Sequence, residues 1–229
     1  MTRTDRVAAA EHVAPALDPA HVLRVAAQVF RERGLADTTL AHVAERLGVP
    51  RAELAGCFAT KDELAQAIFA ETLWILNSAD TKAWTGYGAG MRKSLAVART
   101  FPDGYILLAR DAASLPAYQS SWLALRKRSA RRLQSLIWHP GNPPAGSMRS
   151  PLNDVALEPM INFNITAIRQ WIETGDPSKD DVFLRWCGQM MRDWRHNTCE
   201  LLNLDTPEQD WPFDTEGASL PRRSRPSET

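Results

Sequence analysis

This 229-residue sequence lacks net charge, long apolar runs and cysteine-rich segments. Its 27 Lys and Arg residues balance 27 Asp and Glu residues, so bulk electrostatics alone does not indicate a nucleic-acid binder. No apolar run approaches the roughly 20 residues that a helix needs to cross a bilayer. Residues 1–17 contain no apolar stretch of the signal-peptide type. We therefore expect a cytoplasmic protein with no membrane segment.

Cysteine and the common catalytic motifs are equally scarce. Cys57, Cys187 and Cys199 are too far apart for a metal-ligand set or a disulfide framework, so we expect free thiols and no metal. The sequence has no P-loop, G-x-S-x-G, H-E-x-x-H or glycine-rich dinucleotide turn, and its five histidines are scattered. We therefore predict a protein that is not an enzyme and that needs no cofactor.

Alternating β-branched runs are also absent, while Ala, Leu and Arg dominate, which predicts an all-α fold. Capping signals mark four helices near the N-terminus. They run from Asp18-Pro19 to Gly34, from Thr38-Thr39 to Gly48, from Pro50 to Phe58, and from a capping box at 60–63 to about Asn77.

The rest of the chain differs from this N-terminal part, because all eight tryptophans lie beyond Leu73. Helices are predicted there over 84–100, 104–113, 116–138, 152–174 and 177–202, with a Pro- and Gly-rich loop at 139–151. We divide the chain into a flexible arm (1–17), a helical head (18–64), a larger helical body (65–204) and a disordered tail (205–229).

The first three helices have the layout of a helix-turn-helix. Two short helices are joined by a tight turn at Gly48 and pack on a first helix through small apolar residues such as Ala44 and Leu54. The second short helix can then lie in the major groove of DNA.

This stretch resembles the TetR family of bacterial transcription regulators. The resemblance rests on FRERG (30–34), TTLAHVAERLGV (38–49) and FATKDEL (58–64), and covers about residues 18–75, a third of the chain. It implies a homodimer that reads a near-palindromic operator in double-stranded DNA, and a body that binds a small molecule.

The resemblance also implies DNA-contacting residues. Thr39 would donate to a phosphate, Lys61 would contact the DNA backbone, and Arg51 would contact a base or a phosphate. The alternatives are that Thr39 is only a helix cap and that Lys61 and Arg51 are solvated surface charges. His42 would be an exposed polar residue or a phosphate contact. Glu53 would face solvent or form an ion pair, with acceptance from a cytosine amino group as the alternative. The exposed face of the recognition helix would be completed by Ala52, Ala55 and Gly56.

This helix departs from the family pattern in ways that weaken DNA binding. Pro50 stands where a capping Ser or Thr is usual, and the aromatic or polar residues expected near the end of the helix are replaced by Ala55, Gly56 and Cys57. Residues 1–70 carry eight Lys or Arg and nine Asp or Glu. Binding should therefore be weak and only shallowly salt-dependent. The alternative is a ligand-binding or protein-interaction module that has lost specific DNA binding.

The last two predicted helices carry broad apolar stripes and are joined by a Gly-Asp-Pro turn, which predicts an antiparallel pair. A second copy of the pair would complete a four-helix seam. The predicted interface residues are Met160, Ala167, Trp171, Phe183, Trp186, Met190 and Trp194. The alternative is that these side chains pack into their own core.

A small, apolar ligand is expected between the central helices. Candidate lining residues are Trp74, Trp84, Tyr87, Met91, Tyr105, Trp122 and Phe163, each of which could instead be plain core. A basic cluster at Arg126, Lys127, Arg128, Arg131 and Arg132 is interpreted as a solvated helix face, with a second anion or DNA site as the alternative.

Overall fold

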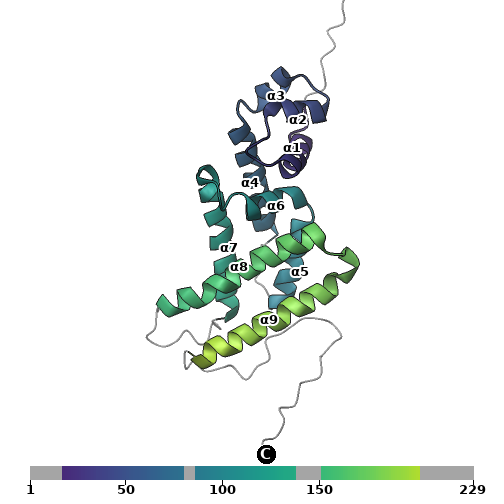
Figure 1. The fold of residues 1–229 in the computed structure, drawn as a ribbon. Coiled ribbons are helices and arrows are strands. Elements are labelled where there is room, and N and C mark those ends of the chain that lie inside the picture. The colour runs from purple at the N-terminus through teal and green to yellow at the C-terminus, as the bar shows by residue number, and fades with distance from the viewer. Residues whose placement is uncertain (1–16, 80–85, 138–150, 202–229) are drawn as a thin grey trace, which may run out of the picture.

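The computed structural model describes residues 17–79, 86–137 and 151–201, and helices are the only regular structure in these ranges (Figure 1). The predicted all-α fold is confirmed. The predicted tail, nearly all of the arm and nearly all of the loop at 139–151 lie outside the described residues. A small head lies at one end of an elongated molecule, and a larger helical body forms the rest.

The head consists of α1 (Pro19–Arg33), α2 (Leu40–Leu47) and α3 (Arg51–Cys57). Its helices begin where the capping signals predicted. The Asp18 carboxylate accepts from the backbone N–H groups of Ala20 and His21 at 3.1 and 3.2 Å. Thr39 caps α2, and Gly48 ends it with φ of 70°, a left-handed conformation that glycine adopts without strain.

Helix α4 (Lys61–Ser78) leaves the head and enters the body. The Thr60 hydroxyl accepts from the Glu63 N–H at 3.1 Å, as predicted. The Glu63 carboxylate accepts from the N–H of Ala59 at 2.9 Å, one residue before the cap. The start of α4 is therefore held from both sides of Thr60.

The body contains α5 (Tyr87–Ala98), α6 (Pro102–Arg110), α7 (Gln119–Ile137), α8 (Pro151–Thr174) and α9 (Asp180–Leu201). Short 3-10 turns precede two of them, η1 (Pro116–Tyr118) before α7 and η2 (Pro177–Lys179) before α9. Proline at the first position of each 3-10 turn lacks an N–H that would otherwise need a partner. The predicted helix ranges are confirmed to within a few residues.

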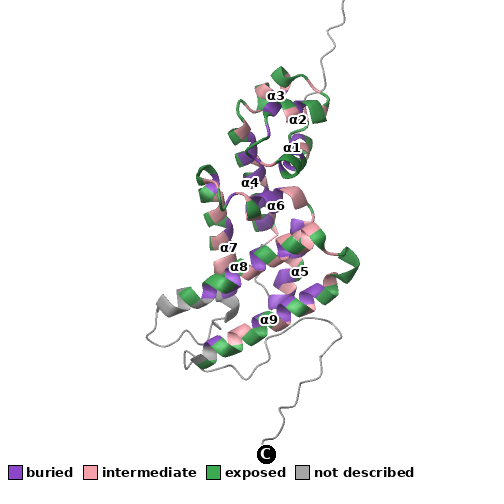
Figure 2. Cartoon of the chain, in the orientation of Figure 1, coloured by how far each residue is buried: buried purple, intermediate pink, exposed green. Residues whose placement is uncertain are grey.

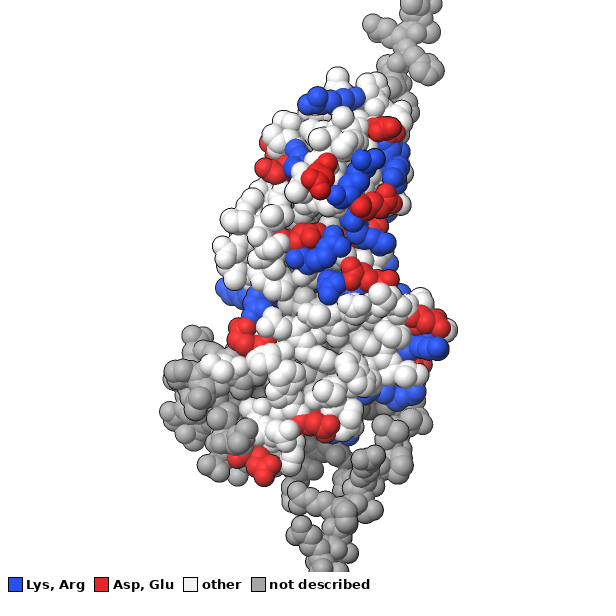
Figure 3. All heavy atoms as spheres, in the orientation of Figure 1, with Lys and Arg blue, Asp and Glu red and all other residues white. Residues whose placement is uncertain are grey.

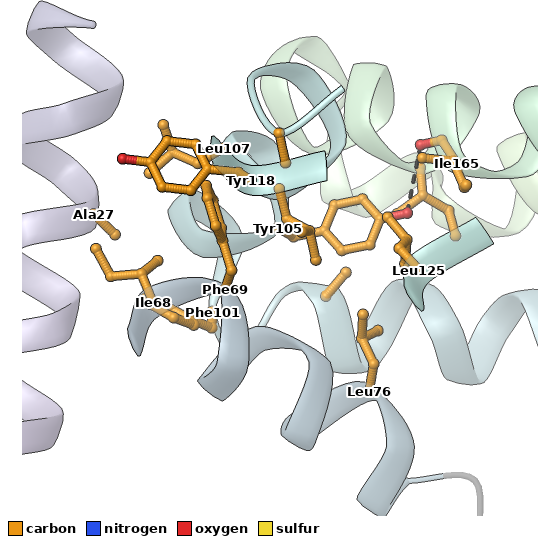
Figure 4. Close-up of a cluster of buried hydrophobic side chains, with 14 of the residues drawn as sticks. Ala27, Ile68, Phe69, Leu76, Phe101, Tyr105, Leu107, Tyr118, Leu125 and Ile165 are labelled. Atoms are coloured by element: carbon orange, nitrogen blue, oxygen red, sulfur yellow. Dashed lines mark hydrogen bonds between the residues drawn. The ribbon is translucent and has the colours of Figure 1, made fainter. Parts of the chain in front are cut away.

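The core is continuous from the head to the body because α6 packs against α1, α4 and α8 (Figure 4). Gly104 permits the close approach of α6 to α4. A Cβ added there would lie 2.6 Å from the Thr72 hydroxyl oxygen and 2.5 Å from the Phe101 ring. Only glycine fits at this contact without displacing a neighbour.

Two polar contacts also join the head to the body. The Arg31 guanidinium of α1 lies 2.6 Å from the Asp103 carboxylate of α6. The Tyr118 hydroxyl of η1 donates to the Asp62 carboxylate in the first turn of α4 at 2.6 Å. Burial, and then the Asp62 carboxylate, raise the pKa of Tyr118, so the hydroxyl keeps its proton at neutral pH.

Candidate nucleic-acid interface and ligand site

Helix α3 is the most exposed helix of the head, and only Leu54 is buried in it (Figure 2). Arg51, Ala52 and Gly56 are exposed, whereas Glu53 and Ala55 are half-buried. Within the described part of the chain, no hydrogen bond or ion pair engages the Arg51 guanidinium. The fork of Arg51 is therefore available for a phosphate or a guanine edge.

The predicted contacts on α2 and α4 are partly engaged within the protein. The His42 N–H donates to the Thr39 hydroxyl oxygen at 3.4 Å, and the His42 Nδ1 accepts from the Thr39 N–H at 3.3 Å. The Lys61 ammonium donates to the Ala36 carbonyl at 3.0 Å. Lys61 thereby lies beside the loop that precedes α2. To contact a DNA phosphate, its ammonium would have to divide its N–H donors between the phosphate and the Ala36 carbonyl.

A salt bridge between helices neutralises a further cation of the head. The Arg46 guanidinium of α2 lies 2.7 Å from the Glu32 carboxylate of α1. The hydrogen bond from Arg46 lowers the pKa of Glu32. Figure 3 shows acidic and basic side chains intermixed over the head on the face in view. Among the described residues of the head, Arg24, Arg33 and Arg51 are the cations that remain exposed without a described partner.

A small cavity of about 20 Å³ lies in the body between α4, α5, α6, α7 and α8. It lies near the core cluster in which Tyr105 points toward Leu125 and Ile165 (Figure 4). Its lining is Leu76, Met91, Ser94, Tyr105, Leu125, Arg128, Ser129, Leu133, Asn164, Ile165 and Ile168. It therefore combines an apolar wall with hydroxyl, amide and guanidinium groups.

Arg128 is the cationic member of this lining. Its side chain is only 7% exposed, and its guanidinium donates to the Leu76 carbonyl in the last turn of α4 at 3.1 Å. The interpretation of the basic cluster as a solvated face is therefore wrong for Arg128. Lys127 and Arg131 are exposed, as that interpretation requires.

Arg126, also in this cluster, is committed to contacts with α8. It donates to the Asn162 side chain at 2.5 Å and pairs with Glu158, and it lies 5.5 Å from the centre of the Trp122 ring. The cluster is thus divided between solvent, α8 and the cavity. The periodicity contained a signal for Arg128, because it stands three residues after Leu125 and five before Leu133, on the buried face of α7.

Two buried tyrosines border the same region. The Tyr87 hydroxyl donates to the Asn164 side-chain oxygen, while the Asn164 amide donates to the Met160 carbonyl at 2.9 Å. The Tyr105 hydroxyl donates to the Ile165 carbonyl at 3.4 Å. Burial raises the pKa of both tyrosines well above the usual range, so both stay protonated donors.

The predicted ligand residues do not form one cluster. Met91 and Tyr105 line the cavity, and Tyr87 contacts it through Asn164. Trp122 is half-buried beside Arg126, and Phe163 faces a different hollow on the surface. Trp74 is 63% exposed on α4, and Trp84 lies outside the described residues. Sequence reasoning missed Ser94, Arg128 and Asn164 as lining residues.

A larger hollow is the α8–α9 groove, an open and mostly apolar depression of about 810 Å³ on the surface. Its aromatic wall includes Trp171 stacked on Phe183 at 4.6 Å, and Phe163 with its ring centre 5.5 Å from that of Trp186. Figure 3 shows that the face over α8 and α9 carries few charged side chains. Val182, Trp186 and Met190 are 55%, 52% and 40% exposed.

The α8–α9 groove contains most of the residues predicted for the dimer interface. Those that line it are Ala167, Trp171, Phe183, Trp186 and Trp194. Met190 is exposed on α9, whereas Met160 is 1% exposed and belongs to the core. The position of α9 is fixed by Asp180, which accepts from the Trp171 indole and the Arg99 guanidinium, both at 2.7 Å.

The described residues offer little support for other kinds of site. They contain no group of three His, Cys, Asp or Glu side chains that could hold a metal ion. None of the helices described is both long enough and apolar enough to cross a membrane. The buried Cys187 thiol has a pKa raised by burial to about 12 and is therefore protonated at neutral pH.

Comparison with known proteins agrees with the geometry of the head. The family model described as bacterial regulatory proteins, tetR family, matches residues 22–68, from α1 into α4. The chain has the head and the fold of the TetR family. No curated protein matches the chain significantly.

Three solved structures illustrate the TetR-like fold over most of the chain. AibR, solved with isovaleryl coenzyme A and operator DNA, is 16% identical, with a TM-score of 0.57 over 75% of this chain and 96% of AibR. A putative transcriptional regulator from Pseudomonas aeruginosa PAO1 is 13% identical, with a TM-score of 0.55 over 80% and 92% of the two chains. The ketosteroid regulator KstR2 of Mycobacterium tuberculosis is 18% identical, with a TM-score of 0.51 over 78% and 93%.

Proposed function

We propose that this TetR-family chain is a DNA-binding transcriptional regulator that acts in the cytoplasm and has no catalytic role. The observation that carries the proposal is the exposed helix α3, presented by a three-helix head that matches the family model. In a helix-turn-helix, this second short helix enters the major groove. Residues 18–64 would bind DNA, and residues 65–204 would bind the ligand and the second subunit.

Arg51 would be the principal side chain that reads DNA. It is exposed near the N-terminus of α3, and the neighbouring Ala52 and Gly56 leave room for close approach of the backbone. Thr39, His42 and Lys61 would contact phosphates around it. Ala55 and Glu53 would contribute little, because both are half-buried.

The homodimer would form through the α8–α9 groove. Soluble monomers rarely expose large apolar patches, yet this face presents Val182, Trp186 and Met190 beside the stacked Trp171 and Phe183. A two-fold axis would place the groove of one subunit against the α8–α9 face of the other. Aromatic residues and methionine are enriched in the cores of such interfaces.

The small-molecule response would pass along α4. This helix begins at the head with Lys61, and its last turn meets Arg128 at the interior cavity. A ligand that binds more tightly to a conformation whose heads cannot span an operator would increase the population of that conformation. The coupling free energy between ligand and DNA binding would be about 1–3 kcal/mol. We therefore propose a repressor that a small, largely apolar ligand releases. The AibR structure shows that a protein of this fold can hold a ligand and operator DNA.

Selection of bound fragments from random DNA by the purified full chain tests the DNA-binding role. A near-palindromic sequence should be enriched, and its affinity should fall as the salt concentration rises. With the selected site placed over a promoter, expression of the protein should lower reporter output. No enrichment above non-specific DNA would instead support a module that has lost specific DNA binding.

A further inference from the structure

One segment of the body contacts the head at both of its ends. This α6–η1 segment comprises residues 102–118. Near its start, the Asp103 carboxylate lies 2.6 Å from the Arg31 guanidinium in the last turn of α1. At its end, the Tyr118 hydroxyl donates to the Asp62 carboxylate in the first turn of α4, also at 2.6 Å. A single segment therefore holds two helices of the head.

Between these two contacts, the α6–η1 segment is packed into the core. Ile106, Leu107, Leu108 and Ala112 are fully buried, and α6 packs against α1 and α4. Apolar packing is non-directional, so it opposes separation of the helices more than it opposes sliding or rotation. Hydrogen bonds weaken steeply as their angle departs from linear. The two polar contacts therefore fix the angle between the head and the body, which we call the head angle.

The Tyr118 contact is the stronger of the two. Tyr118 is 4% exposed, and its ring meets the Phe69 ring of α4 edge to face, with 5.1 Å between the ring centres. The ring is thus held on α4, and its hydroxyl keeps the proton that it donates because burial raises the pKa of Tyr118. The Arg31 side chain is 45% exposed, so water and salt weaken its pair with Asp103.

Asp62 lies in the turn at which α4 joins the head. The preceding residue, Lys61, donates to the Ala36 carbonyl in the loop before α2 at 3.0 Å. The hydrogen bond to the body and the hydrogen bond to the helix-turn-helix therefore come from adjacent residues of one helical turn. Tyr118 is connected to the DNA-binding helices through this turn, although it lies in the body.

We propose that Tyr118, with a smaller contribution from Asp103, is a positioning residue that sets the head angle and thereby the half-site spacing that a dimer reads. This inference rests on the proposed function, because it requires two heads on one operator. Half-sites of helix-turn-helix dimers lie about 10–10.5 base pairs apart, one helical turn. One inserted base pair moves a half-site by about 3.4 Å along the axis and by about 35° around it. A head held at a fixed angle cannot follow both changes.

The head angle is measured without DNA, from the distance between two spin labels in the full chain. One label is attached to the exposed thiol of Cys57 on α3, and the other to Lys127→Cys at an exposed position of α7. Cys199→Ser removes a competing thiol, and the buried Cys187 thiol is protonated and unreactive. An excess of unlabelled chain leaves at most one labelled chain in each dimer.

Tyr118→Phe removes the hydroxyl but keeps the ring on Phe69, and it should broaden the distribution of label distances. Tyr105→Phe is the matched control, because it removes a buried hydroxyl that donates to Ile165 within the body, and it should leave the distribution unchanged. Asp62→Asn keeps an oxygen that accepts and should retain the narrow distribution, whereas Asp62→Ala should broaden it. An unchanged distribution in Tyr118→Phe, or equal broadening in Tyr105→Phe, would overturn the proposal.

Operators with a spacer one base pair longer or shorter than the selected site test the connection to spacing. The wild type should bind them about tenfold or more weakly than the selected site. Tyr118→Phe should reduce this discrimination by about threefold or more, as expected for loss of a hydrogen bond to a charged group. Its affinity for a single half-site should not change, because Tyr118 is buried at the junction. A broadened distance distribution with unchanged discrimination would overturn the assignment to spacing.

The two measurements separate this inference from the proposed function. A broadened distribution in Tyr118→Phe, in a protein that selects no DNA sequence, would support the control of the head angle and overturn the regulator. A selected operator with the same head angle and spacing discrimination in Tyr118→Phe as in the wild type would support the regulator and overturn the positioning role. Changes in both measurements, with Tyr105→Phe unaffected, would support both.

Discussion

The head and the body of this chain present contrasting surfaces. In the head, the cations Arg31, Arg46 and Lys61 are engaged with Asp103, Glu32 and the Ala36 carbonyl. The body exposes a broad apolar face at the α8–α9 groove, where Trp186 is 52% exposed. One surface is poor in the groups that bind DNA, and the other is rich in the groups that bind protein.

This contrast shows how a weak head can still serve a specific regulator. A single head with Arg51 as its main exposed reader would bind DNA poorly. If the proposed seam at the α8–α9 grooves holds two heads together, the second binding event becomes intramolecular, which can raise overall affinity by about 10²–10⁴. The body would therefore determine DNA affinity as much as the head does.

The largest effect is expected from Trp186→Glu in the α8–α9 groove. A charge at the centre of the proposed seam should give monomers at concentrations where the wild type is dimeric, and should weaken operator binding by about 100-fold or more. Sedimentation and DNA titration measure the two changes. The control is Trp74→Glu, which alters a 63% exposed tryptophan on α4. Dimerisation that survives Trp186→Glu, or is lost equally in the control, would contradict the assignment of the seam.

Arg51→Ala should have the next largest effect, confined to DNA binding. Loss of one base or phosphate contact costs about 1–3 kcal/mol, and a dimer loses two such contacts. Fluorescence anisotropy on a selected operator measures this loss. Arg24→Ala, an exposed cation on α1, is the control because it changes the net charge equally. Equal weakening by the two variants would mean that Arg51 acts only through long-range charge.

Two glycine variants compare how a substitution on the head surface and one at the junction between head and body change the free energy of unfolding. Gly104→Ala places a Cβ 2.6 Å from the Thr72 hydroxyl oxygen, and should lower the free energy of unfolding by about 1–3 kcal/mol. Gly56→Ala meets nothing within 4 Å, and should raise it by up to about 1 kcal/mol. Urea unfolding measures both. A neutral Gly104→Ala would show that α6 can move away from α4 at little cost.

The smallest effect is a pH dependence within the head. The pKa of Glu32 is lowered by the hydrogen bond from Arg46. Because the folded-state pKa lies below the unfolded value, the pair stabilises the fold at neutral pH and is lost as the pH falls through the folded-state pKa. Glu32→Gln should therefore unfold with a weaker dependence on pH below about 5, the range in which glutamate titrates. If Glu32→Gln leaves the pH dependence of unfolding unchanged at acid pH, the Glu32–Arg46 pair contributes nothing measurable to stability.

The sequence predicted most of the helices because their ends depend on local interactions. Asp18, Thr39 and Thr60 each satisfy backbone N–H groups within three residues. Gly48 supplies the left-handed turn after α2. The contiguous motifs of the head also made the family recognisable from a third of the chain. None of these inferences required knowledge of which helices pack together.

The interior cavity could not be predicted in the same way. Whether Trp74 and Phe163 face a cavity, a groove or solvent depends on how the helices of the body are arranged, which local sequence does not specify. Arg128 was obscured by its basic neighbours Lys127 and Arg131, although its spacing from Leu125 placed it on the buried face of α7. The signal for a buried position was that Arg128, although charged, lies on the apolar stripe of α7. The basic residues beside it made the whole segment look like an exposed face.

Comparison of a full selected operator with one of its half-sites tests most directly whether DNA binding depends on paired heads. The wild type should bind the full site with two chains per duplex, and should bind the half-site about 100-fold or more weakly. Sedimentation of the complexes gives the stoichiometry, and titration gives the two affinities. Equal affinity for the half-site and the full site, with one chain bound to each, would contradict the account.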